Sequence, residues 1–520
     1  MKQVILTSII CLFVGILQAQ ITTNEQPYGL KGNVKIQRQN KIVLSLPDKT
    51  RIKQEDFVND QQSGLVRYAY PIEVNYTLEN SGVWQQLNDG SKIWRLTVKI
   101  PDALSTNTYY EKFWLPEGGK FFVYSEETRQ SIGAITSEFI GGSKENPIKF
   151  ATAIIYGENV VYEYYQSALV MDTPMISISR IDYGYRYVNN PYEEQHRGFG
   201  DANPLNININ CPEGANWQNE KRAVARISVY TPFGSSWCSG ALINNTKNDG
   251  IPYLLTACHC LPTWMDVETD NDASQWVFYW DYEHTGCNNS SVEPVHKTSL
   301  GSMLIANSVK GHISSTDFAL FRLIQDPRNI NGFTPYYLGW DRGSPISGGV
   351  GIHHPQGDVK KISTYAMVPQ PNISRPFWNI IFCSGITEGG SSGSPLINSY
   401  SKIIGQLGGN DTPLGPGWKW YGRFDASWTG NGLINDRRKL QPWLDPINTN
   451  VLTLDGCGSG DIVNFINKNV NTDETITTCG NINLQNVTVT NNAKLILDAA
   501  GTTTINGPFE VQLGSELEIK

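Results

Sequence analysis

At 520 residues the chain is several times longer than an average domain, so roughly three folded units are expected. Charged residues make up only 17% of it, and 48 glycines and 24 tyrosines are typical of β-rich folds, which argues against a helical bundle. A formal net charge of -8 without a long basic run argues against nucleic acid and anionic membranes as main partners.

The N-terminus has the pattern of a secretory signal peptide at residues 1–19. Lys2 is followed by an apolar stretch from Val4 to Leu17, and Ala19 is a suitable cleavage position. The alternative is a membrane anchor, but the apolar stretch is shorter than the ~20 residues that span a bilayer. We therefore predict no membrane span and a secreted or extracellular protein, in which disulfides are expected.

Residues 20–200 are predicted to form a β-sandwich domain that ends in a linker. Its sequence alternates apolar and polar residues and is rich in aromatic residues at 92–98, 120–124 and 160–165, as strands require. The linker at 189–204 is rich in Asn, Tyr, Gly and Pro. No cluster of nucleophile, base and acid stands out in this region, so we expect the chemistry elsewhere.

The unit at residues 201–455 contains a histidine at the end of an apolar strand. Residues 253–260 read YLLTACHC and place His259 after that strand. An imidazole is the usual general base for a serine hydroxyl, which is a poor nucleophile by itself. Zinc binding by Cys258, His259 and Cys260 is the alternative, but ligands in adjacent positions cannot easily complete a tetrahedron. We therefore expect neither a metal nor another cofactor.

A carboxylate opens the next informative segment. Asp317 begins an alternating, half-buried strand at residues 317–323. A buried Asp at this point could orient an imidazole and stabilise its charged form. Taken singly, an Asp at the start of a strand is more often a turn residue, so its interpretation depends on the other segments.

A glycine-rich turn follows at residues 388–395, which read EGGSSGSP. The turn holds Ser392 just before a strand, where its hydroxyl could attack a carbonyl carbon. The N–H groups of Gly390 and Ser392 would then stabilise the developing oxyanion. Such turns are common in loops, so the argument rests on the order His, Asp, Ser within one β-rich unit.

The tail at residues 456–520 contains a faint internal repeat of 22 residues. Val487, Val489, Leu495 and Leu497 recur as Phe509, Val511, Leu517 and Ile519. Stacked short strands would bury such a pattern, so we predict a small β-solenoid or roll with a structural or attachment role.

The three segments around His259, Asp317 and Ser392 resemble the catalytic segments of the trypsin/chymotrypsin family of serine proteases. Residues 205–455 most resemble the bacterial lysyl endopeptidases and share further motifs with them in the same order, including Cys211–Gly214, Cys238–Gly240, Gly339–Arg342, Ile352–Pro355 and Tyr421–Arg423. The resemblance implies a chymotrypsin-like double β-barrel. It also implies a secreted, monomeric serine endopeptidase that hydrolyses polypeptides through an acyl-enzyme intermediate.

Carried over by position, the resemblance makes His259 the general base, Asp317 its orienting acid and Ser392 the nucleophile, with Gly390 and Ser392 forming the oxyanion hole. The segment at 404–409 would pair with the substrate as an added strand, which makes Gln406, Leu407 and Gly408 substrate-binding residues.

The family pattern also pairs Cys238 with Cys260 and Cys211 with Cys287. Cys457 and Cys479 would then form a local bridge in the tail. Cys258 and Cys383 stay unassigned, either as a further pair or as two buried free thiols.

The residue that reads the substrate side chain differs from the family pattern. Lysyl endopeptidases carry an Asp two positions before Tyr-Gly-Arg, and Lys419 stands there in this chain. This charge reversal would repel a lysine at P1, the substrate residue before the cut bond, and would attract an acidic one. The alternatives are that Lys419 points to solvent with Asp411 in its place, or that the enzyme prefers neutral residues. Gly408 also replaces a histidine of that branch.

The resemblance suggests that residues 20–200 are a pro-domain, which inhibits the enzyme or assists its folding and is released by cleavage at 190–206. The alternative is a retained structural domain. Ser391 occupies the position of the Asp that pairs with the new N-terminus in animal trypsins, so that switch is not available. The competing function is a catalytically silent adhesin or binding protein with a protease fold, although all three triad residues are present.

Overall fold

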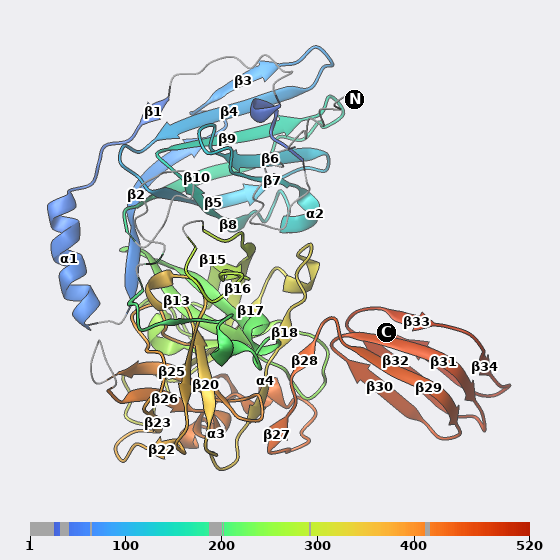
Figure 1. Cartoon of the computed structure of the whole chain (residues 1–520). Coiled ribbons are helices and arrows are strands. Elements are labelled where there is room, and N and C mark those ends of the chain that lie inside the picture. Colours follow the sequence, from blue (N-terminus) through green and yellow to red (C-terminus); the bar gives the residue numbers. More distant parts are fainter. Residues whose placement is uncertain are drawn as a thin grey trace, which may run out of the picture.

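The structure is a computed structural model that describes residues 25–31, 41–62, 65–186, 200, 202–290, 293–410 and 417–520. The predicted signal peptide and most of the predicted linker lie outside these residues. Figure 1 shows a β-rich N-terminal region, a central region with two curled sheets, and a separate β-rich tail. The α-helices described are short except for the first: α1 (Lys49–Gln62), α2 (Ser137–Ile140), α3 (Phe424–Thr429) and α4 (Gln441–Leu444).

Two sheets form the N-terminal region and share one hydrophobic core. The first contains, in spatial order, β1 (Ile42–Val43), β4 (Lys92–Lys99), β9 (Asn159–Gln166), β6 (Gly119–Tyr124) and β7 (Ser131–Ile135), with β3 (Val83–Gln86) also paired to β4. The second contains β2 (Val66–Thr77), β10 (Met175–Gly184), β5 (Ser105–Trp114) and β8 (Ile148–Tyr156). The predicted strands at 92–98, 120–124 and 160–165 are β4, β6 and β9.

A closed barrel of six strands begins the central region. Its strands follow the order β12 (Val224–Thr231), β15 (Asp272–Trp280), β16 (Lys297–Asn307), β17 (Phe318–Leu323), β14 (Tyr253–Ala257) and β13 (Gly234–Leu242), and β13 pairs back to β12. Apolar side chains such as Leu254, Leu320 and Phe321 fill the core of this region and are fully buried. The strand predicted at Asp317 is β17, which pairs with β14; the expected half-buried alternation is wrong, because all its residues except Arg322 are buried in the barrel.

The second curled sheet holds the glycine-rich turn. Its order is β11 (Ile207–Asn208), β21 (Lys361–Tyr365), β20 (Gly349–His353), β24 (Pro395–Asn398), β25 (Lys402–Asn410), β26 (Lys419–Arg423), β23 (Phe377–Ile380) and β22 (Gln370–Pro371). Beyond the end of β23 the chain returns to β21, because Ser384 forms an antiparallel bridge with Thr364. The turn at 388–394 thus enters β24 beside the first barrel.

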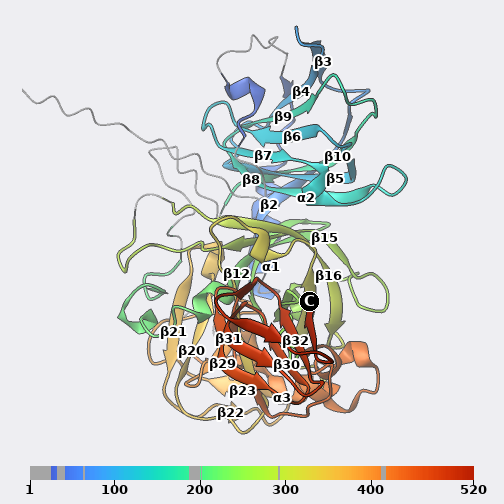
Figure 2. The same ribbon diagram turned by 90° about the vertical axis from the view of Figure 1, so that its right-hand side faces the viewer.

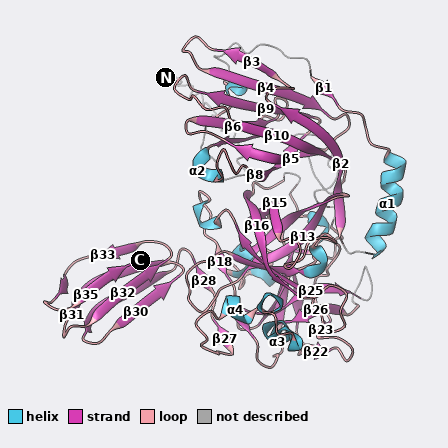
Figure 3. Cartoon of the chain, turned by 180° about the vertical axis from the view of Figure 1, so that it is seen from behind, coloured by secondary structure: helices cyan, strands magenta, loops and turns pink. Residues whose placement is uncertain are grey.

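The N-terminal region and the first barrel form one continuous sheet, which the sequence analysis did not predict (Figure 3). β2 pairs antiparallel with the start of β13, where Val66 lies opposite Trp237 and Ala69 opposite Ser235. The Trp237 ring stacks on Tyr68 with centroids 3.9 Å apart. The twelve-residue strand β2 therefore belongs to both the N-terminal region and the first barrel.

The tail is built from short parallel strands stacked on one another. β29 (Ile462–Val470), β31 (Asn481–Val489), β33 (Thr503–Ile505) and β34 (Phe509–Val511) form one sheet, and β30 (Glu474–Thr478), β32 (Lys494–Ala499) and β35 (Glu516–Ile519) form the other. In register, Val487 lies beside Phe509 and Leu495 beside Leu517, so the predicted 22-residue repeat is confirmed. Figure 2 looks onto these strands.

Candidate active site

His259 and Asp317 lie together at the ends of two paired strands. The Nδ1 atom of His259 is 2.6 Å from Oδ2 of Asp317, and the backbone N–H of His259 donates to Oδ1 of the same carboxylate at 2.8 Å. The carboxylate therefore holds both the ring and the backbone of the histidine. Two hydrogen bonds to one residue fix the ring orientation better than one would.

The backbone around Asp317 explains how the carboxylate reaches the ring. Asp317 has a φ of 60°, in the left-handed region, which turns its side chain toward the end of β14. Its carbonyl accepts a hydrogen bond from the N–H of Cys258 at 2.7 Å. Gln406 Nε2 donates to the carbonyl of Thr316 at 2.7 Å and so fixes the preceding residue.

The surroundings of His259 favour the protonated, charged form of its imidazole. Burial lowers the pKa of its imidazole, but the charge of Asp317 and the hydrogen bond to it outweigh burial and raise this pKa above its ordinary value. Asp317 therefore stabilises the imidazolium form, as required of a residue that accepts a proton during a reaction.

The turn that carries Ser392 packs against the first barrel. The N–H of Ser239 in β13 donates to the carbonyl of Ser392 at 2.8 Å, and Ser239 Oγ donates to the carbonyl of Gly390 at 2.9 Å. Gly393 has a φ of +82°, and a Cβ there would lie 2.0 Å from Thr256 Oγ1. Only glycine fits at this contact between the turn and β14.

The hydrogen-bonding groups of the turn are left available. Within the described residues, the N–H groups of Gly390 and Ser392 donate no hydrogen bond, and Ser392 Oγ makes none. The structure thus brings the Ser392 turn to the strand end that carries His259, but it contains no hydrogen bond between these two side chains. Catalytic hydrogen bonds are often absent or long without substrate.

The predicted substrate strand borders this turn. β25 pairs with β24, and the N–H of Gly393 donates to the carbonyl of Leu407 at 2.9 Å. A Cβ at Gly408 would lie 3.2 Å from Asp317 Oδ2 and 2.8 Å from the Phe377 ring. Gly408 therefore lies beside the candidate catalytic carboxylate, where a larger side chain would not fit without movement.

Lys419 is buried, with 1% of its surface exposed, so the alternative that it points to solvent is wrong. β26 holds it between β25 and β23, opposite Asn410 and Ile380. Burial, together with the charges of Lys361 and Lys419, lowers the pKa of His353 to about 3. Nδ1 of that neutral His353 lies 2.8 Å from Ser391 Oγ, so the charge of Lys419 acts close to the nucleophile turn.

Three disulfides are present, and their pairs are those named above: Cys211–Cys287, Cys238–Cys260 and Cys457–Cys479. With Cys260 in a disulfide, the alternative zinc site next to His259 loses one of its ligands. Cys258 and Cys383 are both free, so the suggested pair does not form. The other alternative holds only for Cys258, because Cys383 is exposed. Burial raises the pKa of the Cys258 thiol to about 12.

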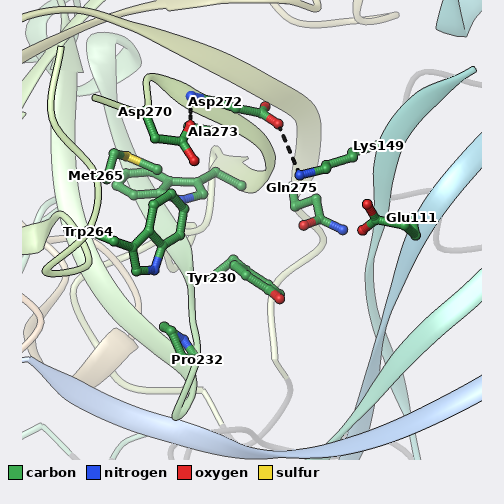
Figure 4. Close-up of a pocket in the computed structure, with 11 residues that line it drawn as sticks. Glu111, Lys149, Tyr230, Pro232, Trp264, Met265, Asp270, Asp272, Ala273 and Gln275 are labelled. Atoms are coloured by element: carbon green, nitrogen blue, oxygen red, sulfur yellow. Dashed lines mark hydrogen bonds and ion pairs between the residues drawn. The ribbon is translucent and has the colours of Figure 1, made fainter. Parts of the chain in front are cut away.

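A pocket of about 250 Å³ lies elsewhere, between β5 and β8 of the N-terminal region and the first barrel (Figure 4). Glu111 and Lys149 line it from one side, and Trp264 and Asp272 line it from the other. Lys149 Nζ lies 3.7 Å from Asp272 Oδ2 across the pocket. Its lining includes none of the candidate catalytic residues, so it is separate from the site above.

A family model, the C-terminal domain of lysyl endopeptidase, matches residues 199–413. A lysyl endopeptidase of Pseudomonas aeruginosa is 25% identical over 257 residues, which are 45% of this chain and 51% of that protein. The chain therefore spans about half the length of this relative.

Similar solved structures include two serine proteases. One is a serine endoprotease from Yersinia pestis, 15% identical with a TM-score of 0.27, covering 40% of this chain and 60% of that one. The other is the thermostable serine protease AL20 from an extremophilic microorganism, 14% identical with a TM-score of 0.28, covering 39% and 92%. TM-scores this low carry no argument about function.

Proposed function

Since residues 199–413 belong to the lysyl endopeptidase family, we propose that this chain is a serine endopeptidase that cuts polypeptides with His259, Asp317 and Ser392. The observation that carries the proposal is that the carboxylate of Asp317 accepts hydrogen bonds from both the ring and the backbone N–H of His259. This pair lies next to a turn in which, among the described residues, the N–H groups of Gly390 and Ser392 donate no hydrogen bond. Residues 201–455 would be the double-barrel protease domain, between a domain at 20–200 and a tail at 456–520.

The reaction follows from these groups. Ser392 Oγ attacks the carbonyl carbon of the substrate while Nε2 of His259 takes its proton, and Asp317 stabilises the imidazolium. The N–H groups of Gly390 and Ser392 donate to the oxyanion. The C–N bond then breaks, His259 passes its proton to the leaving amine, and water releases the acyl group by the same steps in reverse order.

Labelling with a fluorophosphonate tests the proposal, because this probe reacts with an activated serine hydroxyl. The purified protein should be labelled at Ser392, and Ser392→Ala should abolish the reaction. Ser394→Ala, two residues along the same turn, is the matched control and should still be labelled. Labelling that persists in Ser392→Ala contradicts the assignment, and a folded chain without any labelling favours the silent binding protein.

We also propose that the enzyme does not prefer lysine at P1, and that it takes acidic or neutral residues. The buried Lys419 stands where the family carries an Asp, and a fixed positive charge beside the substrate pocket disfavours a cationic side chain. Sequencing the peptides from a digested, denatured protein tests this. Cuts clustered after Lys would contradict it.

We propose that the protein acts outside the cytoplasm, because three disulfides are present and disulfides form and persist in oxidising compartments. We also propose that it is a monomer. Within the ranges that the structure covers, no helix has both the length and the apolar character to cross a bilayer. Attachment to a cell surface, if any, would fall to the tail. Mass spectrometry of the secreted product tests the leader and both termini.

A further inference from the structure

The glycine-rich turn is supported from behind by a second turn. The N–H of Gln356 donates to the carbonyl of Gly389 at 2.6 Å. A Cβ at Gly390 would lie 3.0 Å from both the N–H nitrogen of Gly357 and the carbonyl oxygen of His354. The segment 354–358 therefore fixes the peptide that precedes the candidate oxyanion donor Gly390. We call this segment the support turn.

The support turn needs a partner of its own. Gln356 has a φ of 55°, which a residue with a side chain adopts only when its surroundings enforce it. Arg226 of β12 supplies one contact, since its Nη1 donates to the carbonyl of Gly357 at 2.8 Å. This hydrogen bond joins the first barrel directly to the support turn.

Arg226 is itself held in a cage of aromatic rings. It is 1% exposed, and its guanidinium carbon lies 3.8 Å from the ring centre of Tyr282, 4.2 Å from that of Trp237 and 4.4 Å from that of Tyr279. Such contacts favour a planar guanidinium over an ammonium. The cage leaves Arg226 little freedom to move away from Gly357.

A buried carboxyl group, that of Glu293, connects this cage to the N-terminal region. Oε1 of Glu293 accepts a hydrogen bond from Tyr282 at 2.6 Å and one from Tyr156 of β8 at 2.9 Å. Burial raises the pKa of Glu293, and the charge of Arg226 and the two tyrosine hydroxyls lower it; the net value is about 7. Contacts therefore run without a break from Tyr156 through Glu293, Tyr282 and Arg226 to the support turn.

We propose that Arg226 is a positioning residue for the oxyanion hole, and that the N-terminal region, through Tyr156, helps to hold it. This inference rests on the proposed function, because it assigns the turn at Gly390 to catalysis. It gives the N-terminal region a role that a purely inhibitory pro-domain would not have. While docked, it supports the catalytic turn.

The test uses the full secreted chain and the rate of phosphonylation by a fluorophosphonate, separated into the maximal rate and the half-saturating concentration. Arg226→Met removes the donor to Gly357, and the maximal rate should fall by roughly 10- to 100-fold with the half-saturating concentration nearly unchanged. Arg226→Lys keeps a cation and a donor and should lose less than about 5-fold. Tyr156→Phe should lose about 3-fold, since Glu293 keeps one of its two hydrogen bonds.

Arg180→Met is the matched control. Arg180 is as buried as Arg226, lies over the rings of Tyr109 and Tyr230, and bonds to Asp182 and to the carbonyl of Thr231. It has no contact with the support turn in the described structure. Its loss should lower the melting temperature and leave the maximal rate within about 2-fold, measured below that temperature.

The outcomes separate the two proposals. A folded wild-type chain that is not labelled at Ser392 contradicts the proposed function itself. An active wild-type chain with equal losses in Arg226→Met and Arg180→Met, or with no loss in the former, overturns the positioning role. Should Arg226→Met fail to fold, the milder Arg226→Lys and Tyr156→Phe decide, and unchanged maximal rates in both would overturn it.

Discussion

The two ends of the chain join the central region in very different ways. The N-terminal region shares a sheet with the first barrel, and Trp237, Val277, Tyr279 and Leu300 of the barrel belong to the same hydrophobic core as that region. The tail has a separate core of its own residues, and among its residues only Cys457 and Cys479 belong to the core of the central region. It meets the central region through short contacts, such as the pairing of β18 (Tyr336–Tyr337) with β28 (Cys457–Gly458).

This difference shows that the position of a domain in the chain does not determine how extensively it packs against the central region. A shared core is lost when either partner is removed, whereas a separate core survives. The N-terminal region should therefore behave as part of the folded central region, and the tail as an appendage.

Deletion of each end tests most directly whether the central region needs that end to fold. Removal of residues 20–186 exposes Trp237, Tyr279 and their apolar neighbours on the barrel, so we expect an insoluble or unfolded product without fluorophosphonate labelling. Removal of 462–520 combined with Cys457→Ser should leave folding and labelling intact. Soluble yield, circular dichroism and labelling measure both. A well-folded, active chain without residues 20–186 would show that the shared core is dispensable.

A cavity-creating substitution in each core tests whether the two cores unfold separately. Trp237 and Leu484 are both fully buried. Trp237→Ala should cost about 3–5 kcal/mol and lower the unfolding transition of the joined N-terminal and central bodies. Leu484→Ala should cost about 2–5 kcal/mol and shift only a separate transition of the tail. Calorimetry distinguishes these results. A single transition that moves in both variants would mean that the tail unfolds together with the rest.

Two disulfides of equal loop length make a matched pair. Cys238–Cys260 and Cys457–Cys479 both have a sequence separation of 22. Replacing either pair with serines should cost about 3 kcal/mol by loss of the loop constraint. The first joins β13 to the residue after His259, so its loss should also slow labelling, whereas loss of the second should not. Equal effects on labelling would contradict the independence of the tail.

The three segments that form the candidate site could be found in the sequence, because each combines local chemistry with a strand signal. His259 follows an apolar strand, Asp317 directly precedes another, and Ser392 lies in a turn where Gly393 is required by a close contact. The stacking of the tail was also predictable, since its repeat is regular. The suggested Cys258–Cys383 pair and the alternative that Lys419 points to solvent were wrong, because both depend on which strands enclose the residue.

The integration of the N-terminal region could not be predicted. The pairing of β2 with β13 joins residues more than 160 positions apart, and no local pattern at Val66 or Ser235 indicates that their edges meet. Arg226, Glu293 and Tyr156 likewise carry no motif, and the two charged residues would be expected on a surface from their residue type alone. Their meeting is a product of tertiary structure.

The smallest expected effect concerns the pH dependence of this junction. Glu293 has a pKa of about 7 in the folded chain because it is buried, above the roughly 4.3 of an exposed glutamate. Between these values the folded state holds a proton that the unfolded state has lost, so the contribution of Glu293 to stability is greatest below about pH 4.3 and declines as the pH rises toward 7.

The decline attributable to Glu293 is at most about 4 kcal/mol, which corresponds to the whole difference between the two pKa values and already includes the effects of the charges of Arg226 and Asp358. Glu293→Gln keeps the shape and the hydrogen bonds but cannot ionise, so thermal unfolding of its N-terminal and central bodies should vary less with pH over this range. The tail transition should not respond to the substitution. If the variant follows the wild-type pH profile, Glu293 is not the group that titrates over this range.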